Sequence, residues 1–302
     1  MIARTGRMVA GLAPETRGAL GMVTAMFVFI CMDAIAKHLS ESLPPLQVVW
    51  ARYVSQTILV AVIFLPSLAR RLRTQNLGLQ LLRSGLLFGA TSLFFTGLAV
   101  MPLAEATALM ELGPLMITAL AALILREHVG PRRWAGVVVG LIGALIILRP
   151  GFGVFQPAAL LVIVAAACIA GYQIATRAMS ESDSIWTTML YSTLVGSIAA
   201  TAILPFVWEP PPVELIPLMA TIGWIGFVGH LSMIWALMQA PASVLAPFNY
   251  SQLVWSIIVG YVIFSEWPDA MTLLGAAVIV CAGLYVWHRE RVRQGPADLP
   301  PQ

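Results

Sequence analysis

Two loops in this chain have related sequences and different charge. The first, Arg126-Glu-His-Val-Gly-Pro-Arg-Arg133, holds three arginines, and the second, Ser265-Glu-Trp-Pro-Asp-Ala-Met-Thr272, holds none. Their glutamates are separated by 139 residues (266 − 127 = 139). The same shift superposes other pairs, namely Pro102 on Pro241, Gly136 on Gly275, Leu98 on Leu237 and Leu145 on Leu284. The sequence therefore predicts two copies of one unit.

The chain around these loops is apolar enough to cross a membrane many times. Apolar residues make up 59% and charged residues 10% of its 302 residues, whereas a soluble domain has about 45–50% and about 25%. One crossing of a bilayer needs about 20 apolar residues. Expected spans run near 18–37, 46–65, 81–98, 103–125, 134–148, 158–175, 185–206, 215–237, 242–264 and 270–287. This pattern excludes a water-soluble globule and predicts an all-α membrane protein of about ten transmembrane helices.

The distribution of arginines predicts how the two units are oriented. Cytoplasmic loops are enriched in Lys and Arg, and a cytoplasmic amino terminus places nearly all loop arginines inside. These are Arg70, Arg71, Arg73, Arg83, Arg126, Arg132, Arg133, Arg177, Arg289, Arg291 and Arg293, with Arg149 alone outside. Each unit has five crossings, so the second must be inverted. We expect repeats at 18–148 and 157–287, with cytoplasmic tails at 1–17 and 288–302.

Several other classes of protein are not supported by the sequence. The cysteines lie in apolar spans without a Cys-x-x-Cys pair, and no histidine cluster has metal-ligand spacing, so we expect no disulfide, metal or cofactor. The sole lysine, Lys37, is not in a P-loop, which argues against ATP hydrolysis. We find neither H-E-x-x-H nor G-x-S-x-G, so we do not expect an enzyme. The scattered basic residues do not suggest a nucleic-acid partner.

Ionisable residues inside spans are candidates for function, because each costs about 2.5–3.5 kcal/mol to insert. Asp33 and Lys37 are four residues apart in the order that favours an ion pair within one helix. Alternatively, Lys37 extends toward the outer interface. Arg52 lies in the second span, where it either attracts an anionic or carbonyl group of a solute or pairs with Asp33 or Glu105.

Glu111 marks a second candidate site. It precedes Gly113-Pro114, and proline removes a helical hydrogen bond and exposes carbonyl groups. Its equivalent in the second unit is Tyr250 (250 − 111 = 139), which follows Asn249. Interrupted helices at matching positions of inverted repeats indicate a binding site near the middle of the membrane. We therefore predict that Glu111, Asn249 and Tyr250 contribute to a transport site, with helix packing as the alternative.

Three further polar residues complete the candidates. Tyr172 and Gln173 fall at the repeat positions of Asp33 and Ala34, and His230 lies in the eighth span. His230 either relays protons or is an ordinary hydrogen-bonded histidine.

Several aromatic residues could stack on a planar ligand or form an interfacial belt facing lipid: Phe94, Phe95, Trp224, Trp235, Phe248 and Trp255. Glycines spaced four apart, at 85 and 89 and at 136 and 140, the latter pair followed by Gly143, suggest close helix packing.

Two short segments resemble a known family. They are Pro102-Leu-Ala-Glu-Ala-Thr107 and Ala246-Pro-Phe-Asn-Tyr250, set in two five-helix repeats. Together they resemble the drug/metabolite transporter superfamily, and within it the EamA-type transporters. The resemblance implies a pseudo-twofold bundle in the bacterial inner membrane with a substrate cavity between its halves.

A narrower likeness covers the segment from Ser243 to Tyr285, which is similar to EamA-type importers of riboflavin and of S-adenosylmethionine. We expect riboflavin uptake first, with S-adenosylmethionine import or export of amino acids, drugs or other metabolites as alternatives. The implied partners are a small-molecule substrate and the lipid bilayer. Assembly as a homodimer is left open.

Overall fold

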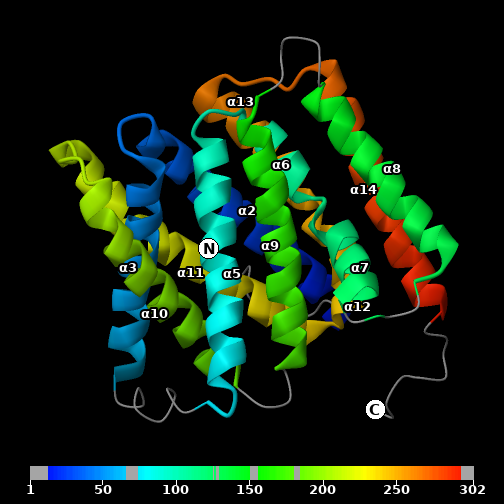
Figure 1. The fold of residues 1–302 in the computed structure, drawn as a ribbon, viewed down its shortest axis with the longest axis horizontal. Helices are drawn as coiled ribbons and strands as arrows, with labels where there is room; N and C mark the ends of the chain where they lie inside the picture. The colour runs from blue at the N-terminus through cyan, green and yellow to red at the C-terminus, as the bar shows by residue number, and fades with distance from the viewer. Residues whose placement is uncertain are drawn as a thin grey trace.

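The computed structural model describes residues 13–65, 74–124, 126, 129–149, 156–179 and 184–293, which form an all-helical bundle (Figure 1). Glu127, used above to align the repeats, lies outside the described residues. The helices are α2 (Pro14–Ser40), α3 (Pro45–Phe64), α5 (Leu77–Leu98), α6 (Leu103–Met110), α7 (Gly113–Ile124), α8 (Pro131–Leu148), α9 (Ala158–Ala178), α10 (Ile185–Ile203), α11 (Ile216–Gln239), α12 (Ala242–Asn249), α13 (Ser251–Phe264) and α14 (Ala270–Arg293). Short 3-10 turns at Leu204–Phe206 and Val213–Leu215 join α10 to α11.

Nine of the ten predicted spans are confirmed. Within the described residues, nine helical segments are long and apolar enough to cross a membrane, and α6 with α7 forms one of them. The tenth predicted span, 242–264, consists of the two shorter helices α12 and α13, which a break at Tyr250 divides. Three helices begin earlier than predicted because Pro14, Pro45 and Pro131 occupy their first positions. Proline suits that position because the N–H it lacks would have no partner there.

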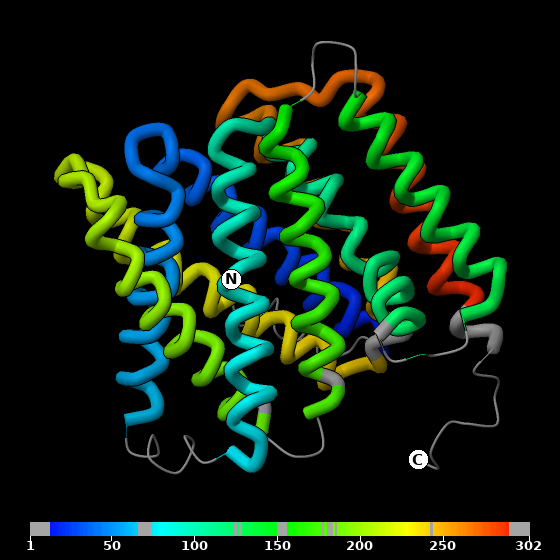
Figure 2. The backbone as a smooth tube through the Cα atoms, viewed as in Figure 1, coloured from blue at the N-terminus to red at the C-terminus, as the bar shows by residue number. Residues whose placement is uncertain are grey.

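The two units are interlocked by their packing. Helix α2 packs on α11, and α5 packs on α9; under the repeat, α2 corresponds to α9 and α11 to α5, so these two contacts are equivalent. Helix α8 packs on α14, the helix that corresponds to it in the second unit, and this pair lies along one edge of the bundle (Figure 2). Each unit therefore buries its first helix against the third helix of the other unit, as a pseudo-twofold architecture requires.

Both broken spans keep the same geometry at equivalent positions. The fourth span is interrupted at Glu111 and Leu112, between α6 and α7, and the ninth at Tyr250. At their far ends, Arg126 (φ 54°) and Ser265 (φ 56°) both adopt the left-handed conformation, and they are equivalent under the repeat (265 − 126 = 139). The repeat thus preserves backbone turns as well as helix positions.

Small residues bring α8 and α14 into backbone contact. A Cβ atom built on Gly275 would lie 2.6 Å from the carbonyl oxygen of Gly143 and 2.6 Å from Cγ1 of Ile147. The prediction of close packing is therefore confirmed for this pair. It is wrong for Gly85 and Gly89, because a Cβ on either meets nothing within 4 Å in the described chain.

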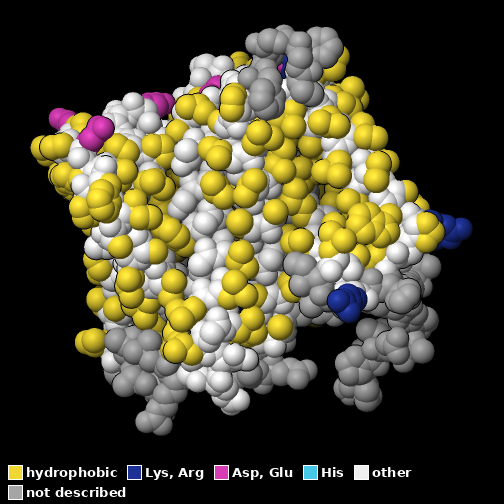
Figure 3. Space-filling model, viewed as in Figure 1, with side chains coloured by type: hydrophobic (Ala, Val, Ile, Leu, Met, Phe, Trp, Pro, Cys, Tyr) yellow, Lys and Arg dark blue, Asp and Glu magenta, His cyan; other side chains and the backbone are white. Residues whose placement is uncertain are grey.

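The outer surface of the bundle is apolar. In the face shown in Figure 3, hydrophobic side chains are spread over all the described helices in view, and charged side chains are sparse. Large hydrophobic side chains on several helices are more than two-thirds exposed, as in Leu123 (68%), Ile198 (69%) and Val262 (72%). Such a surface suits hydrocarbon and not water.

Candidate functional site

The centre of the candidate site is Arg52 on α3, whose residue is only 6% exposed. Its Nη1 donates to Oγ1 of Thr91 on α5 (2.8 Å), and that hydroxyl lies 3.2 Å from the hydroxyl of Tyr53. The guanidinium carbon lies 5.2 Å from the ring centre of Tyr53 and 5.7 Å from that of Phe95. Its Nε is buried and has no hydrogen-bond partner in the described part of the chain. One strong donor therefore remains for another acceptor.

Asp33 and His230 complete this group from two further helices. Asp33 on α2 is 4% exposed and interacts electrostatically with Arg52. His230 on α11 interacts with both Arg52 and Arg83, and its ring lies edge-on to Phe29 at 5.0 Å. Nδ1 of His230 is buried and also lacks a hydrogen-bond partner among the described residues. The first unit and the second thus both contribute to one polar cluster.

Arg83 on α5 adds a second buried cation. It was predicted as one of the arginines of the inner side, but it is only 3% exposed. The polar groups around it are neutral: Nε donates to Thr176 (2.6 Å), Nη1 to the Thr188 carbonyl (3.0 Å) and to Ser192 (2.7 Å), and Nη2 to the Tyr172 hydroxyl (2.7 Å). Tyr172 therefore joins the cluster as the partner of Arg83, whose guanidinium carbon lies 4.4 Å from the centre of its ring.

Glu111 and Tyr250 lie at the breaks of their two spans. Glu111 is the residue that ends α6 and is 7% exposed, and it interacts electrostatically with Tyr250. The Tyr250 hydroxyl lies against Gly283 of α14. Asn249, at the end of α12, is half-buried and directly precedes Tyr250 in the sequence. The break positions predicted from the repeat are therefore present, while a role for these three residues in transport stays a prediction.

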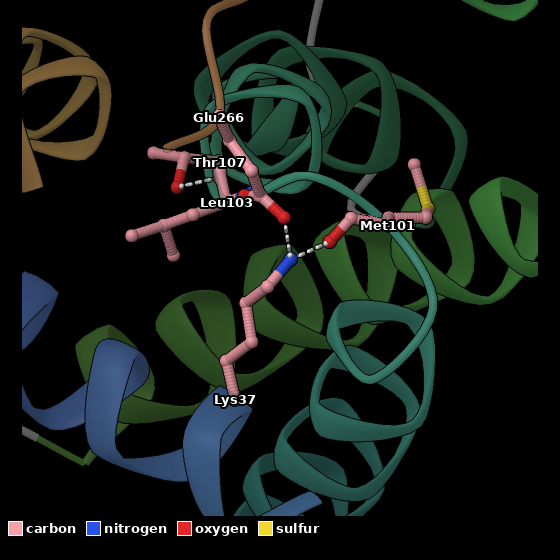
Figure 4. Close-up of polar contacts among 5 residues, drawn as sticks. All are labelled: Lys37, Met101, Leu103, Thr107 and Glu266. Carbon is pink, nitrogen blue, oxygen red and sulfur yellow. Dashed lines mark hydrogen bonds and ion pairs between the residues drawn. The ribbon is translucent and has the colours of Figure 1, made fainter. Parts of the chain in front are cut away.

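Lys37 does not pair with Asp33, so the predicted ion pair within α2 is wrong. Its Nζ lies 2.7 Å from Oε1 of Glu266 and donates to the carbonyl oxygen of Met101 at 2.5 Å (Figure 4). Oε2 of Glu266 accepts from the backbone N–H of Leu103 at 3.0 Å. The left-handed turn at Ser265 directs the glutamate into the bundle. We call Lys37, Met101, Leu103 and Glu266 the Lys37 cluster.

A second ion pair, Arg149 with Asp269, lies at the same end of the molecule. The Arg149 hydrogen bond, followed by the backbone N–H of Thr272, lowers the pKa of Asp269 to about 2. The hydrogen bond to Asp269 in turn raises the pKa of Arg149. Glu105 interacts electrostatically with Asp269, Arg149 and Lys37. Of the two partners predicted for Arg52, Asp33 interacts with it electrostatically, without an ion pair within 4 Å, and Glu105 belongs to this other group.

The remaining candidates lie apart from the polar cluster. Gln173 is exposed on α9. Trp224 and Trp235 are 47% and 42% exposed, which agrees with the belt interpretation and not with stacking inside the bundle. Phe95, by contrast, is 2% exposed and lies beside Arg52.

Sequence reasoning missed Thr91, Tyr53 and Arg83. A signal for Thr91 existed, since it is the repeat equivalent of His230 (230 − 91 = 139). Arg83 lies inside the predicted span 81–98, where its charge already marked it as a functional candidate.

Comparison with known proteins identifies the family. The sequence model of the EamA-like transporter family matches residues 16–149 and again residues 156–287. The chain belongs to this family. A riboflavin transporter of Vibrio cholerae is 32% identical over 289 residues, which cover 92% of this chain and 96% of that protein.

Two other relatives have different names. An S-adenosylmethionine uptake transporter of Rickettsia felis is 29% identical over 86% of this chain and 88% of its own length. The pseudopaline exporter CntI of Pseudomonas aeruginosa is 27% identical over 88% of this chain and 94% of its own length. The EamA-like protein is thus a multi-pass membrane protein and a secondary transporter of a small metabolite, and it is not an enzyme.

Proposed function

We propose that this EamA-like protein takes up riboflavin across the bacterial inner membrane. The observation that carries the proposal is the unpartnered Nε of Arg52, buried between the two units beside Thr91 and Phe95. The isoalloxazine ring of riboflavin is planar and carries two carbonyl oxygens and acceptor nitrogens on one edge. A guanidinium donor with an aromatic neighbour suits that edge, and a charge-assisted hydrogen bond to it is stronger than a neutral one.

The inverted repeats supply the mechanism. The two units rock around the cluster formed by Asp33, Arg52, Thr91 and His230, so that it opens to each side in turn. Because Asp33 and Glu111 are buried carboxyl groups near the breaks and the cluster, either one is the group that couples transport to protons. If Glu111→Gln leaves uptake, its pH dependence and its substrate affinity unchanged in folded protein, this role for Glu111 is wrong.

S-adenosylmethionine is the second candidate substrate. It carries a carboxylate and positively charged groups, and Arg52 and Asp33, which interact electrostatically, are side chains of opposite type that could bind them. The relative from Rickettsia felis supports this alternative. Export, suggested by the relative named as a pseudopaline exporter, reverses the direction and keeps the same cluster.

Uptake in cells distinguishes these functions. We would express the protein in a bacterium that neither makes riboflavin nor has an importer for it, and measure entry of labelled riboflavin against empty vector. Saturable uptake that unlabelled flavins inhibit and S-adenosylmethionine does not is the expected result. Competition only by S-adenosylmethionine, or no entry by protein shown to be folded in the membrane, contradicts riboflavin uptake.

A matched pair of variants tests the cluster itself. Arg52→Gln removes the buried donor, and we expect KM for riboflavin to rise by about tenfold or more, since a hydrogen bond to a charged group contributes about 1.5–3 kcal/mol. Arg132→Gln removes an exposed arginine at the start of α8 and should leave KM unchanged. Equal KM values for the two variants would show that Arg52 does not bind the substrate.

A further inference from the structure

The Lys37 cluster joins the two units of the transporter at one end of the bundle. Lys37 comes from the last turn of α2, and Met101 and Leu103 come from the turn between α5 and α6, all in the first unit. Glu266 comes from the segment between α13 and α14 in the second unit. The ion pair therefore crosses the boundary between the two bodies that must move relative to each other (Figure 4).

The contact is well satisfied and largely shielded from water. The side chain of Lys37 is 10% exposed and that of Glu266 is 28% exposed, with 2.7 Å between Nζ and Oε1. The second carboxylate oxygen binds the first backbone N–H of α6, where the positive end of the helix favours an anion. The ring centre of Phe264 lies 5.3 Å from Nζ and covers the cation. Breaking this pair exposes two charges that the closed end protects.

A second contact closes the same end. Arg149, which follows α8 in the first unit, binds Asp269, which precedes α14 in the second unit. Glu105 interacts with both cations and links the two contacts electrostatically. This end of the bundle, predicted to face outside by the arginine distribution, is thus held by opposite charges across the boundary between the units.

The residues of these contacts are mostly not repeated at the other end of the bundle. Under the repeat, Lys37 corresponds to Thr176 (176 − 37 = 139), Asp269 to Gly130 and Glu105 to Val244. Of these residues only the glutamate is shared, as Glu127 and Glu266, and Lys37 is the sole lysine of the sequence. The fold is pseudo-symmetric, but the sequence that forms these contacts is not.

We propose that the Lys37–Glu266 ion pair is the outer gate of this transporter and that it biases the substrate-free protein toward the state closed on that side. Opening the outer end separates α2 from the α13–α14 segment and breaks the pair. A contact made in one of two states shifts their populations by its free energy. The inference rests on membership of the transporter family and not on riboflavin as the substrate.

Distance measurement between spin labels tests the gate without any substrate. Labels at Ser42, in the exposed turn after α2, and at Met271, exposed at the start of α14, report the separation of the two units at that end. The native cysteines, Cys31, Cys168 and Cys281, are first replaced by serine. In Lys37→Gln and in Glu266→Gln, we expect the population with a longer label–label distance to rise by about tenfold relative to the population with the closed-state distance.

A control variant makes the result specific. Glu41→Gln removes the exposed His38–Glu41 contact at the same end of α2 (3.1 Å), which lies within one unit, and should leave the distances unchanged. If both glutamine variants are monodisperse and keep the wild-type distances, the pair is not a gate.

Discussion

Replacing Gly275 by alanine should separate α8 from α14. The added Cβ would lie 2.6 Å from the carbonyl oxygen of Gly143, and real Cβ atoms essentially never come closer than 3.0 Å to such an atom. Because the oxygen belongs to a helix backbone, the clash is relieved only by moving one helix. Overpacking of this kind costs about 1–3 kcal/mol.

The matched control is Gly85→Ala on α5, where the same methyl group meets nothing within 4 Å. There, alanine should stabilise the helix by about 0.5–1 kcal/mol relative to glycine. The two variants should therefore differ by about 1.5–4 kcal/mol. With an unfolding entropy of about 2.1 cal/mol/K per residue for 302 residues, this difference corresponds to about 2–6 °C in melting temperature.

The assay is thermal denaturation of purified protein in one detergent, followed by the fraction that remains monodisperse on size exclusion. Gly275→Ala should melt below wild type, and Gly85→Ala at or slightly above it. Melting temperatures of the two variants within about 1 °C of each other would refute the argument that backbone contact holds α8 against α14.

Three further predictions concern single contacts. Tyr172→Phe removes one of the acceptors of Arg83 and should destabilise the protein by about 1.5–3 kcal/mol in a melting experiment. Tyr285→Phe, which loses an exposed 3.4 Å contact to Arg289, should not, and equal losses in the two variants would contradict a structural role for the Arg83–Tyr172 hydrogen bond. Arg149 lowers the pKa of Asp269 from 3.8 to about 2, so the contribution of this carboxylate to stability is complete above about pH 4 and is lost as the pH falls toward 2. The difference in melting temperature between wild type and Asp269→Asn should therefore be the same at pH 7 and pH 5 and smaller at pH 3. A change in this difference between pH 7 and pH 5 would contradict the lowered pKa of Asp269. Ser265 has a left-handed backbone conformation, so Ser265→Gly should be neutral or stabilising, whereas Ser265→Val should lower the free energy of unfolding by about 1–2 kcal/mol in the same assay. A valine variant as stable as wild type would show that this backbone turn is not required.

Much of the fold was predictable because its signals are local or repeated. Span lengths follow from apolar runs, and the breaks at Glu111 and Tyr250 follow from one shift of the sequence on itself. The early helix starts at Pro45 and Pro131 were missed because hydropathy does not register a proline that begins a helix.

The candidate site was less predictable because its contacts join distant segments. Lys37 was expected to bind Asp33, four residues away, but its partner Glu266 is 229 residues away (266 − 37 = 229). Spacing along one helix cannot say which way a long side chain turns, and α2 presents Lys37 to the other unit. Arg83 was misplaced for a related reason, since its position near the start of α5 resembles a loop arginine until α9 and α10 surround it.

The equivalent left-handed turns at Arg126 and Ser265 have a consequence for how the protein is made. The same backbone turn serves one unit on the inner face and the other on the outer face, so it carries no information about direction. Direction during synthesis must come from the flanking arginines, which the first loop has and the second lacks. Adding arginines to the second loop while the first keeps its own would favour the inner side for both loops, and parallel units cannot interlock α2 with α11 and α5 with α9.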